Sequence, residues 1–168
     1  MASTGVFTDT FREKFAELTG GQLVSPTQEQ MAISWFVVGE GGYQTVSGGT
    51  APKVPNASRT DIEATIDSTL PTGESSTGAR FAKALQPSDV TVNGKDIQVV
   101  CVLDANEADL DLHSHLTGNL NGNPRIHEIG IFDGDPSSQP STMIAYCTLD
   151  SIIKQAGRRV QITVNISF

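Results

Sequence analysis

Hydrophobic and polar residues alternate strictly over residues 160–168, at the end of the chain. Because successive side chains of a β-strand point to opposite faces, this alternation predicts a strand with one buried face. Residues 31–38 are rich in β-branched and aromatic side chains and predict another strand. Residues 125–133 predict a third strand, and residues 142–149 are its expected partner. The nearly continuous apolar run at residues 97–103 predicts a central strand that is buried on both faces.

A helical pattern lies near the N-terminus. Residues 6–18 predict an amphipathic helix, because large apolar side chains recur at spacings of four, four and three. The pair Gly20 and Gly21 would end this helix. The apolar stripe can pack on the core of the domain or bury itself in a neighbouring subunit, and the sequence leaves both readings open. Its members are Phe7, Phe11, Phe15 and Leu18.

The middle of the chain is less regular. Gly, Ser, Thr, Pro and Asn dominate residues 39–58, which predicts a long irregular loop. Residues 59–70 predict a short helix, since Ile62 and Ile66 lie four apart and Pro71 follows. Further along, Asn93-Gly94 is a strong turn signal between two strands.

These elements predict an α+β fold, mainly an antiparallel β sheet or sandwich, with an N-terminal amphipathic helix and one short central helix. The expected organisation is an N-terminal helical docking segment at residues 1–24, followed by a β-rich attachment domain at residues 25–168. The irregular loop at residues 39–58 belongs to the second part.

Composition narrows the classes of partner. With 11 basic and 19 acidic residues the chain carries a formal charge of −8. Such a chain repels phosphate backbones, so we expect no nucleic-acid partner. No apolar stretch approaches the roughly 20 residues of a membrane-spanning helix, and the N-terminus lacks the regions of a secretory signal. We therefore expect a soluble protein made in a cytoplasm.

The two cysteines, Cys101 and Cys147, both lie in apolar runs. We expect buried thiols that act as small hydrophobic side chains. A disulfide between neighbouring strands is the alternative. Metal binding by these residues is disfavoured, because the chain has no CxxC spacing.

Three histidines, His113, His115 and His127, are the candidate metal ligands. The first two lie two residues apart, on one side of an extended segment, and could bind a transition metal together with His127 or with copies from other subunits. Local hydrogen bonding in a loop is the ordinary reading of this pattern. The acidic side chains between residues 104 and 111 do not follow the spacing of a calcium loop and predict a solvated acidic loop.

Motifs of catalysis are missing from the sequence. There is no GxSxG nucleophile motif, and the cysteines are too apolar in context to be activated thiolates. The glycine-rich residues 39–42 lack the Lys-Ser/Thr of a phosphate-binding loop. We therefore expect a protein that is not an enzyme and that needs no cofactor.

Two segments of the sequence stand out together: residues 33–42 (ISWFVVGEGG) and residues 126–133 (IHEIGIFD), the latter followed by residues 143–146 (MIAY) and the alternating last strand. In this order they resemble the N-terminal domain of bacteriophage tail-collar fibre proteins. The glycines of the first segment would allow a sharp turn, and Gly130 would sit where a side chain has no room. Members of this family usually continue into a long fibre, whereas this sequence stops at Phe168, which favours an attachment module without direct host-receptor binding.

The resemblance implies a structural subunit of a phage-type tail baseplate that attaches or adapts tail fibres. Its partners would be other baseplate proteins and tail fibres, and a homo-oligomer, with a trimer favoured, is expected. It would reside in the virion, and in the host cytoplasm during assembly. The expected contact elements are the N-terminal helix and the long loop. Their interface residues are Phe7, Phe11, Phe15, Leu18, Tyr43, Pro52 and Pro55.

Two alternatives come from other classes of protein. The first is a carbohydrate-binding β module for host surface glycans, which would need exposed aromatic side chains on a loop. The sequence offers Trp35, Tyr43 and Tyr146, of which Trp35 is expected in the core. The second is a small metal-dependent enzyme that uses the three histidines.

Overall fold

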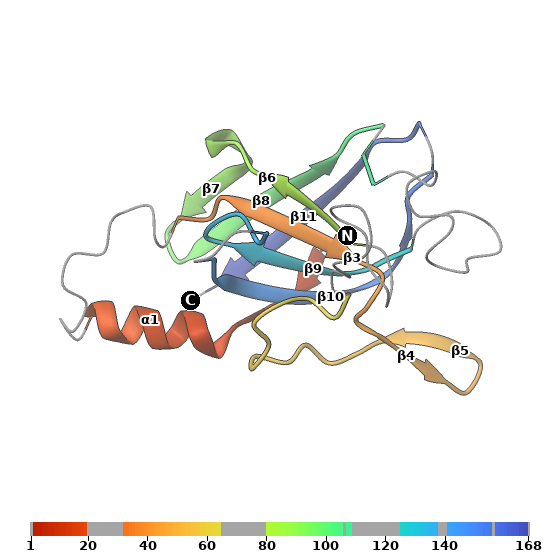
Figure 1. The fold of residues 1–168 in the computed structure, drawn as a ribbon, viewed down its shortest axis with the longest axis horizontal. Coiled ribbons are helices and arrows are strands. Elements are labelled where there is room, and N and C mark those ends of the chain that lie inside the picture. Colours follow the sequence, from red (N-terminus) through yellow and green to blue (C-terminus); the bar gives the residue numbers. More distant parts are fainter. Residues whose placement is uncertain are drawn as a thin grey trace.

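The computed structural model describes residues 2–19, 32–64, 80–105, 107–108, 125–137, 141–155 and 157–167. Two sheets and a separate hairpin make up most of this part (Figure 1). The four-stranded sheet has the order β1 (Ala2–Thr4), β11 (Val160–Ser167), β8 (Asp96–Leu103) and β7 (Val90–Asn93). The five-stranded sheet has the order β2 (Val6–Phe7), β10 (Met143–Ile153), β9 (Arg125–Phe132), β3 (Trp35–Gly39) and β6 (Arg80–Ala84). The remaining elements are the hairpin β4 (Tyr43–Val46) and β5 (Gly49–Pro52), the helix α1 (Asp9–Thr19) and a 3₁₀ turn η2 (Pro87–Asp89).

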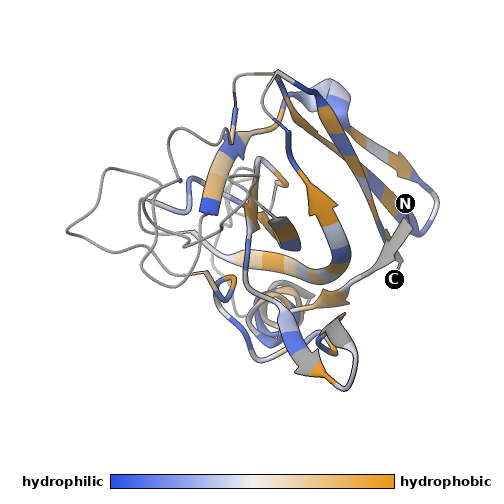
Figure 2. Ribbon diagram, turned by 90° about the vertical axis from the view of Figure 1, so that its right-hand side faces the viewer, coloured by the Kyte–Doolittle hydropathy of each residue, from blue (hydrophilic) through white to orange (hydrophobic). Residues whose placement is uncertain are grey.

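The two sheets share one hydrophobic core. Buried side chains of β8 and β11 form a single cluster with those of β3, β9 and β10. Hydrophobic residues alternate with hydrophilic ones along the strands in Figure 2. The alternation predicted for the last strand is confirmed, because Ile162, Val164 and Ile166 are buried between polar neighbours. The mainly antiparallel β character of the fold follows the sequence expectation, and β1, which runs parallel to β11, is the exception.

The outer face of the five-stranded sheet is also covered. Ile62 and Ala64 form a second buried cluster with side chains of β3, β9 and β10. In consequence β9, from Ile126 to its end at Phe132, is buried on both faces. The prediction of a doubly buried strand at residues 97–103 is wrong, since β8 alternates between buried and less buried positions. The physical reason is that, among the described residues, the buried side chains of β8 pack on the opposing sheet while those of its other face are less buried.

The N-terminal segment contributes a strand before its helix. Residues Val6–Phe7 pair with β10, so the helix begins at Asp9 and not at residue 6 as predicted. Thr8 caps it, because its hydroxyl accepts a hydrogen bond from the backbone N–H of Phe11 at 3.3 Å. The Phe7 ring stacks on that of Phe11 from the strand, with centroids 5.2 Å apart.

The same segment crosses from one sheet to the other. Strand β1 pairs with β11 in the four-stranded sheet, and β2 pairs with β10 in the five-stranded sheet. Gly5 lies between them against Cys147, in a place where a side chain would overlap the Cys147 sulfur. Residues 2–7 of the predicted docking segment therefore belong to the two sheets.

Two predictions for the middle of the chain are corrected. Residues 59–64 form no helix, because the backbone N–H groups of Glu63 and Ala64 are turned toward a carboxylate of β9. The rest of that predicted helix, residues 65–70, lies outside the described residues. The loop predicted at residues 39–58 contains the hairpin of β4 and β5, in which Tyr43 pairs with Pro52. The turn predicted at Asn93-Gly94 is confirmed by the β7–β8 hairpin, where Gly94 has a φ of 64°.

Candidate functional site

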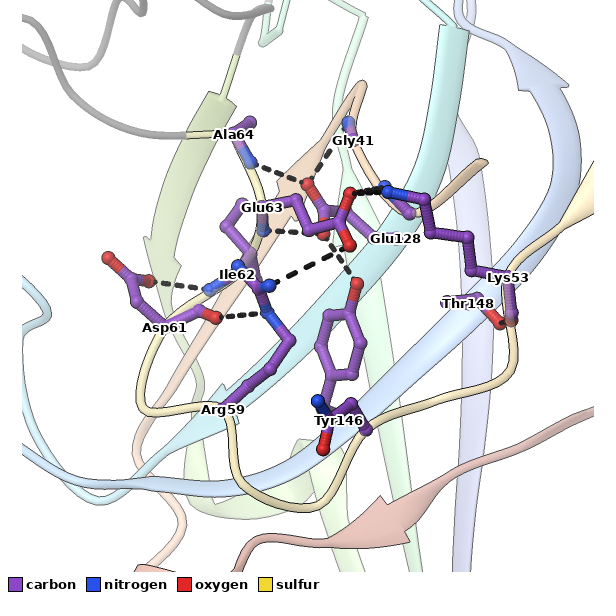
Figure 3. A network of polar contacts seen from close by, with 12 residues as sticks. Gly41, Lys53, Arg59, Asp61, Ile62, Glu63, Ala64, Glu128, Tyr146 and Thr148 are labelled. Carbon is purple, nitrogen blue, oxygen red and sulfur yellow. Dashed lines mark hydrogen bonds and ion pairs between the residues drawn. The ribbon is translucent and has the colours of Figure 1, made fainter. Parts of the chain in front are cut away.

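The buried carboxylate of Glu128 lies at the centre of a polar network on the outer face of the five-stranded sheet (Figure 3). Its Oε1 accepts hydrogen bonds from the backbone N–H groups of Gly41 at 3.0 Å and Ala64 at 2.9 Å. Its Oε2 accepts from the N–H of Glu63 at 2.7 Å and from the Tyr146 hydroxyl at 2.8 Å. Four donors converge on one side chain and tie together segments that are far apart in the sequence.

This arrangement makes Glu128 a structural residue. A carboxylate has only acceptor sites, and the four donors, none of them an ionised group, match its two oxygens. A buried charge is tolerated only when hydrogen bonds replace its lost hydration, and backbone N–H groups do so here. The carboxylate therefore fixes the turn at Gly41 and the segment at residues 63–64, and its acceptor capacity is used by the protein itself.

A second carboxylate, that of Glu63, extends the network to the base of the hairpin. Its Oε2 accepts from the Gly42 N–H at 3.1 Å and from the Lys53 ammonium at 2.6 Å. Burial acts to raise the pKa of Glu63, but the bonds from Lys53 and Gly42 outweigh it and leave the pKa below its ordinary value. The Lys53 carbonyl accepts from the Thr148 hydroxyl at 2.6 Å, so β10 also joins the base of the hairpin.

The Tyr146 hydroxyl acts as a donor to this network. Burial first, and then the charge of Glu128 beside it, raise the pKa of Tyr146 well above its ordinary value. The phenol therefore keeps its proton and can donate to the carboxylate. The Arg59 guanidinium lies 5.5 Å from the centroid of the ring, which is within the range of a cation–π contact.

Glycine is required in the network for two different reasons, a positive φ at one position and a lack of space for a side chain at another. Gly42 has a φ of 74°, a conformation that L side chains rarely adopt, so the expected backbone freedom is used at this position. At Gly41 a side chain would meet Glu63 and the Glu128 carboxylate, so this position needs space. Gly130 is also confined, as expected, because a Cβ there would lie 2.8–2.9 Å from Phe132, Ile62 and Met143.

Four large exposed apolar side chains lie on the helix, on the hairpin and just beyond the hairpin. Phe15 of α1 is 45% exposed, and Tyr43 and Val46 of β4 are each 42% exposed. Val54, just beyond β5, is 87% exposed. In Figure 1 the helix and the hairpin lie toward opposite ends of the lower side of the molecule. The Asp9 N–H binds the Ala57 carbonyl at 2.8 Å and joins the helix to the loop that follows β5. We call Phe15, Tyr43, Val46 and Val54 the α1–hairpin surface.

The predicted interface residues differ in how exposed their side chains are. Phe15, Tyr43 and Pro52 are exposed, whereas Pro55 is half-buried. Phe11 is buried and Phe7 is half-buried, so these two pack on the domain core. The backbone of Leu18 belongs to α1, but its side chain lies outside the described residues.

The candidate metal ligands do not form a described site. His113 and His115 lie outside the described residues. His127 is buried, and its ring lies against that of Tyr43 with centroids 4.7 Å apart. Within the part of the chain that the structure describes, no group of three or more His, Cys, Asp or Glu side chains is placed to hold a metal ion.

The acidic loop and the cysteines have structural surroundings. Asp104 and Glu107 contact the Lys83 ammonium at 3.0 and 2.6 Å. The prediction that this acidic loop is simply solvated does not account for these two ion pairs. The acidic residues 109 and 111 lie outside the described residues. Cys101 and Cys147 are buried free thiols, as expected, and burial raises the pKa of Cys101 far above its ordinary value.

Sequence reasoning missed Glu128, Glu63 and Lys53 as site residues, and also Val46 and Val54. A signal for Glu128 was present: a charged residue in a strand between apolar neighbours must find buried partners. The partners themselves, three backbone N–H groups, leave no trace in the sequence. Similarly, an exposed valine cannot be told from a buried one in a segment without periodicity.

Comparisons with known proteins identified no relative of this chain. No protein-family model, no curated protein and no solved structure matches the chain. Among the described residues, no helix has the length and the apolar character that crossing a bilayer requires.

Proposed function

We propose that this protein is a structural, non-enzymatic subunit of a phage-type tail baseplate that attaches or adapts tail fibres. The observation that carries the proposal is the contact between Gly41 and Glu128. These residues belong to the two segments that resemble the tail-collar fibre family, and the Gly41 N–H binds the Glu128 carboxylate at 3.0 Å. The segments that carry the resemblance thus form one structural unit, which supports their reading as a single module.

The network beneath the α1–hairpin surface supports an attachment role. Two-stranded hairpins are marginally stable alone, and this one pairs with neither main sheet. The Lys53–Glu63 ion pair and the bond from the Thr148 hydroxyl to the Lys53 carbonyl fix the base of the hairpin to the body. The bond from the Lys53 N–H to the Gly42 carbonyl at 2.9 Å closes the base of the hairpin itself. A rigid base of this kind presents Tyr43 and Val46 in one orientation, which lowers the entropy cost of binding a partner.

The proposed partners are other baseplate proteins and tail fibres, and the proposed location is the tail of the virion. Large exposed apolar side chains are the usual centre of protein–protein contacts. The α1–hairpin surface has four of them, one on α1, two on β4 and one just beyond β5. A homo-oligomer, with a trimer favoured by the symmetry of fibres, remains part of the proposal.

Electron microscopy of tail particles tests the proposal. Particles would be assembled with the wild-type chain, with a Phe15→Ser/Tyr43→Ser variant, and with Val92→Ser as control. Val92 is 68% exposed on β7 of the other sheet, so its change alters a comparable side chain elsewhere. We expect fibres on wild-type and control particles and their loss in the double variant. Fibres in normal number on particles that lack the chain altogether would overturn the proposal.

A further inference from the structure

A cavity of about 350 Å³ lies between the start of α1, the segment at Thr60 and Asp61, and the ends of β9 and β10. Its volume falls at the lower end of the range of roughly 300–1,000 Å³ that is typical of small-molecule sites. A ligand the size of one sugar ring suits such a space. The lining residues are Thr10, Thr60, Asp61, Phe132, Pro136, Ser141, Thr142 and Met143.

Hydroxyl groups dominate the polar part of this lining. The side chains of Thr10 and Thr60 make no hydrogen bond to the described residues, so both hydroxyls are able to donate and accept. The Thr142 hydroxyl accepts from the Lys14 ammonium and keeps its own proton for donation. The pocket therefore offers donors and acceptors in similar number, as a polyhydroxyl ligand requires.

The charges around the cavity favour a neutral ligand. Asp61 contacts the buried Arg80 guanidinium at 2.8 Å, and Lys14 contacts Asp133 at 3.4 Å. Each of these two cations is thus paired with a carboxylate, and together the two pairs add no net positive charge at the described lining that would attract an anion. The Asp61 side chain is still 47% exposed, so its carboxylate can accept further hydrogen bonds in addition to its ion pair with Arg80.

An apolar wall completes the lining. Phe132, Met143 and Pro136 also border the cavity. A sugar ring has both characters, since its hydroxyl groups bind hydrogen-bond partners while its C–H faces pack on apolar side chains. We propose that this cavity binds one neutral saccharide unit, either as a free sugar or as the terminal residue of a glycan.

Ligand-detected NMR on the full chain tests this inference. The probes are glucose, galactose, mannose and N-acetylglucosamine, each as free sugar and as methyl glycoside, with inorganic phosphate as an anionic comparison. We expect saturation transfer to at least one neutral sugar and none to phosphate. A methyl glycoside that binds as well as its free sugar would support a glycan terminus, whereas binding of the free sugar alone would support a small soluble ligand.

Three isosteric variants locate the binding. Thr10→Val and Thr60→Val each remove one lining hydroxyl that has no partner in the described structure, so folding should be unaffected. We expect each to weaken saccharide binding by about threefold to tenfold. Thr91→Val, an exposed threonine of β7, is the matched control and should bind as the wild type does.

The outcomes decide between the readings. Absence of binding by every neutral sugar, binding of phosphate in their place, or equal affinity in all three variants would overturn the inference. The cavity and the α1–hairpin surface share no residue, so Phe15→Ser/Tyr43→Ser should keep saccharide binding. The inference therefore stands or falls separately from the attachment role.

Discussion

Glu128 shows how one buried charge can organise distant parts of a chain. Glu128→Ala would leave three backbone N–H groups and the Tyr146 hydroxyl without their acceptor in a buried site. Each unsatisfied buried group costs about 1–3 kcal/mol, so we expect a loss of at least about 3 kcal/mol in the free energy of unfolding. Urea denaturation measures this loss. Glu13→Ala on the exposed face of α1 is the control and should change stability by less than about 0.5 kcal/mol.

The contribution of Glu63 should depend on pH. Its pKa is lowered in the folded protein, so the folded state binds fewer protons than the unfolded state in the acid range. The stability that Glu63 contributes is therefore complete above about pH 4.5, the ordinary pKa of a glutamate, and is lost as pH falls through its lowered value. Lys53→Met should flatten this part of a urea stability profile measured from pH 7 to pH 3. Lys95→Met, in the exposed β7–β8 turn, should leave the profile unchanged, and an equal effect of both would refute the role of Lys53.

At the scale of elements, the hairpin of β4 and β5 should be separable from the fold. It contacts the body at its base, where the Lys53 ammonium pairs with Glu63 and the Lys53 carbonyl accepts from the Thr148 hydroxyl. Replacing residues 44–51 by Gly-Gly should thus change the free energy of unfolding by about 1 kcal/mol or less, while attachment of fibres is lost. Urea denaturation and electron microscopy of tail particles check the two parts. Loss of cooperative unfolding in the shortened chain would show instead that the hairpin belongs to the core.

The sequence could predict that a strand lies at β3, β9 and β10, but it could predict which face is buried only where polar residues alternate with apolar ones. The alternation of β11 follows from a single buried side, and the β7–β8 turn follows from the demand for a positive φ at Gly94. The double burial of β9 could not be predicted, since it depends on Ile62 and Ala64 arriving from a separate segment. For the same reason residues 59–64 resemble a helix in spacing but give their N–H groups to Glu128. Tertiary hydrogen bonds overrode the local pattern there.

At the scale of the whole molecule, the N-terminal residues act as a tie between the two sheets. Strand β1 completes one sheet, β2 completes the other, and Phe7 covers the core beside Phe11. Deleting residues 1–7 would remove both pairings and expose apolar side chains of β10. We expect a loss of several kcal/mol in the free energy of unfolding, about 2–5 kcal/mol from the burial of Phe7 and the lost pairing together. Urea denaturation of the shortened chain measures it.

This deletion also bears on where attachment takes place. Residues 1–7 contribute strands to both sheets, and these sheets support α1. If the shortened chain is destabilised as expected, a loss of assembly after the truncation would be explained by impaired folding. It would then give no evidence that these residues dock on a partner. Point changes on exposed positions such as Phe15 then become the proper test of the surface, since they leave the tie intact. A shortened chain as stable as the whole protein would reverse this conclusion. The two sheets would then be stable without β1 and β2. Residues 1–24 could again be interpreted as a docking segment separate from the β-rich domain.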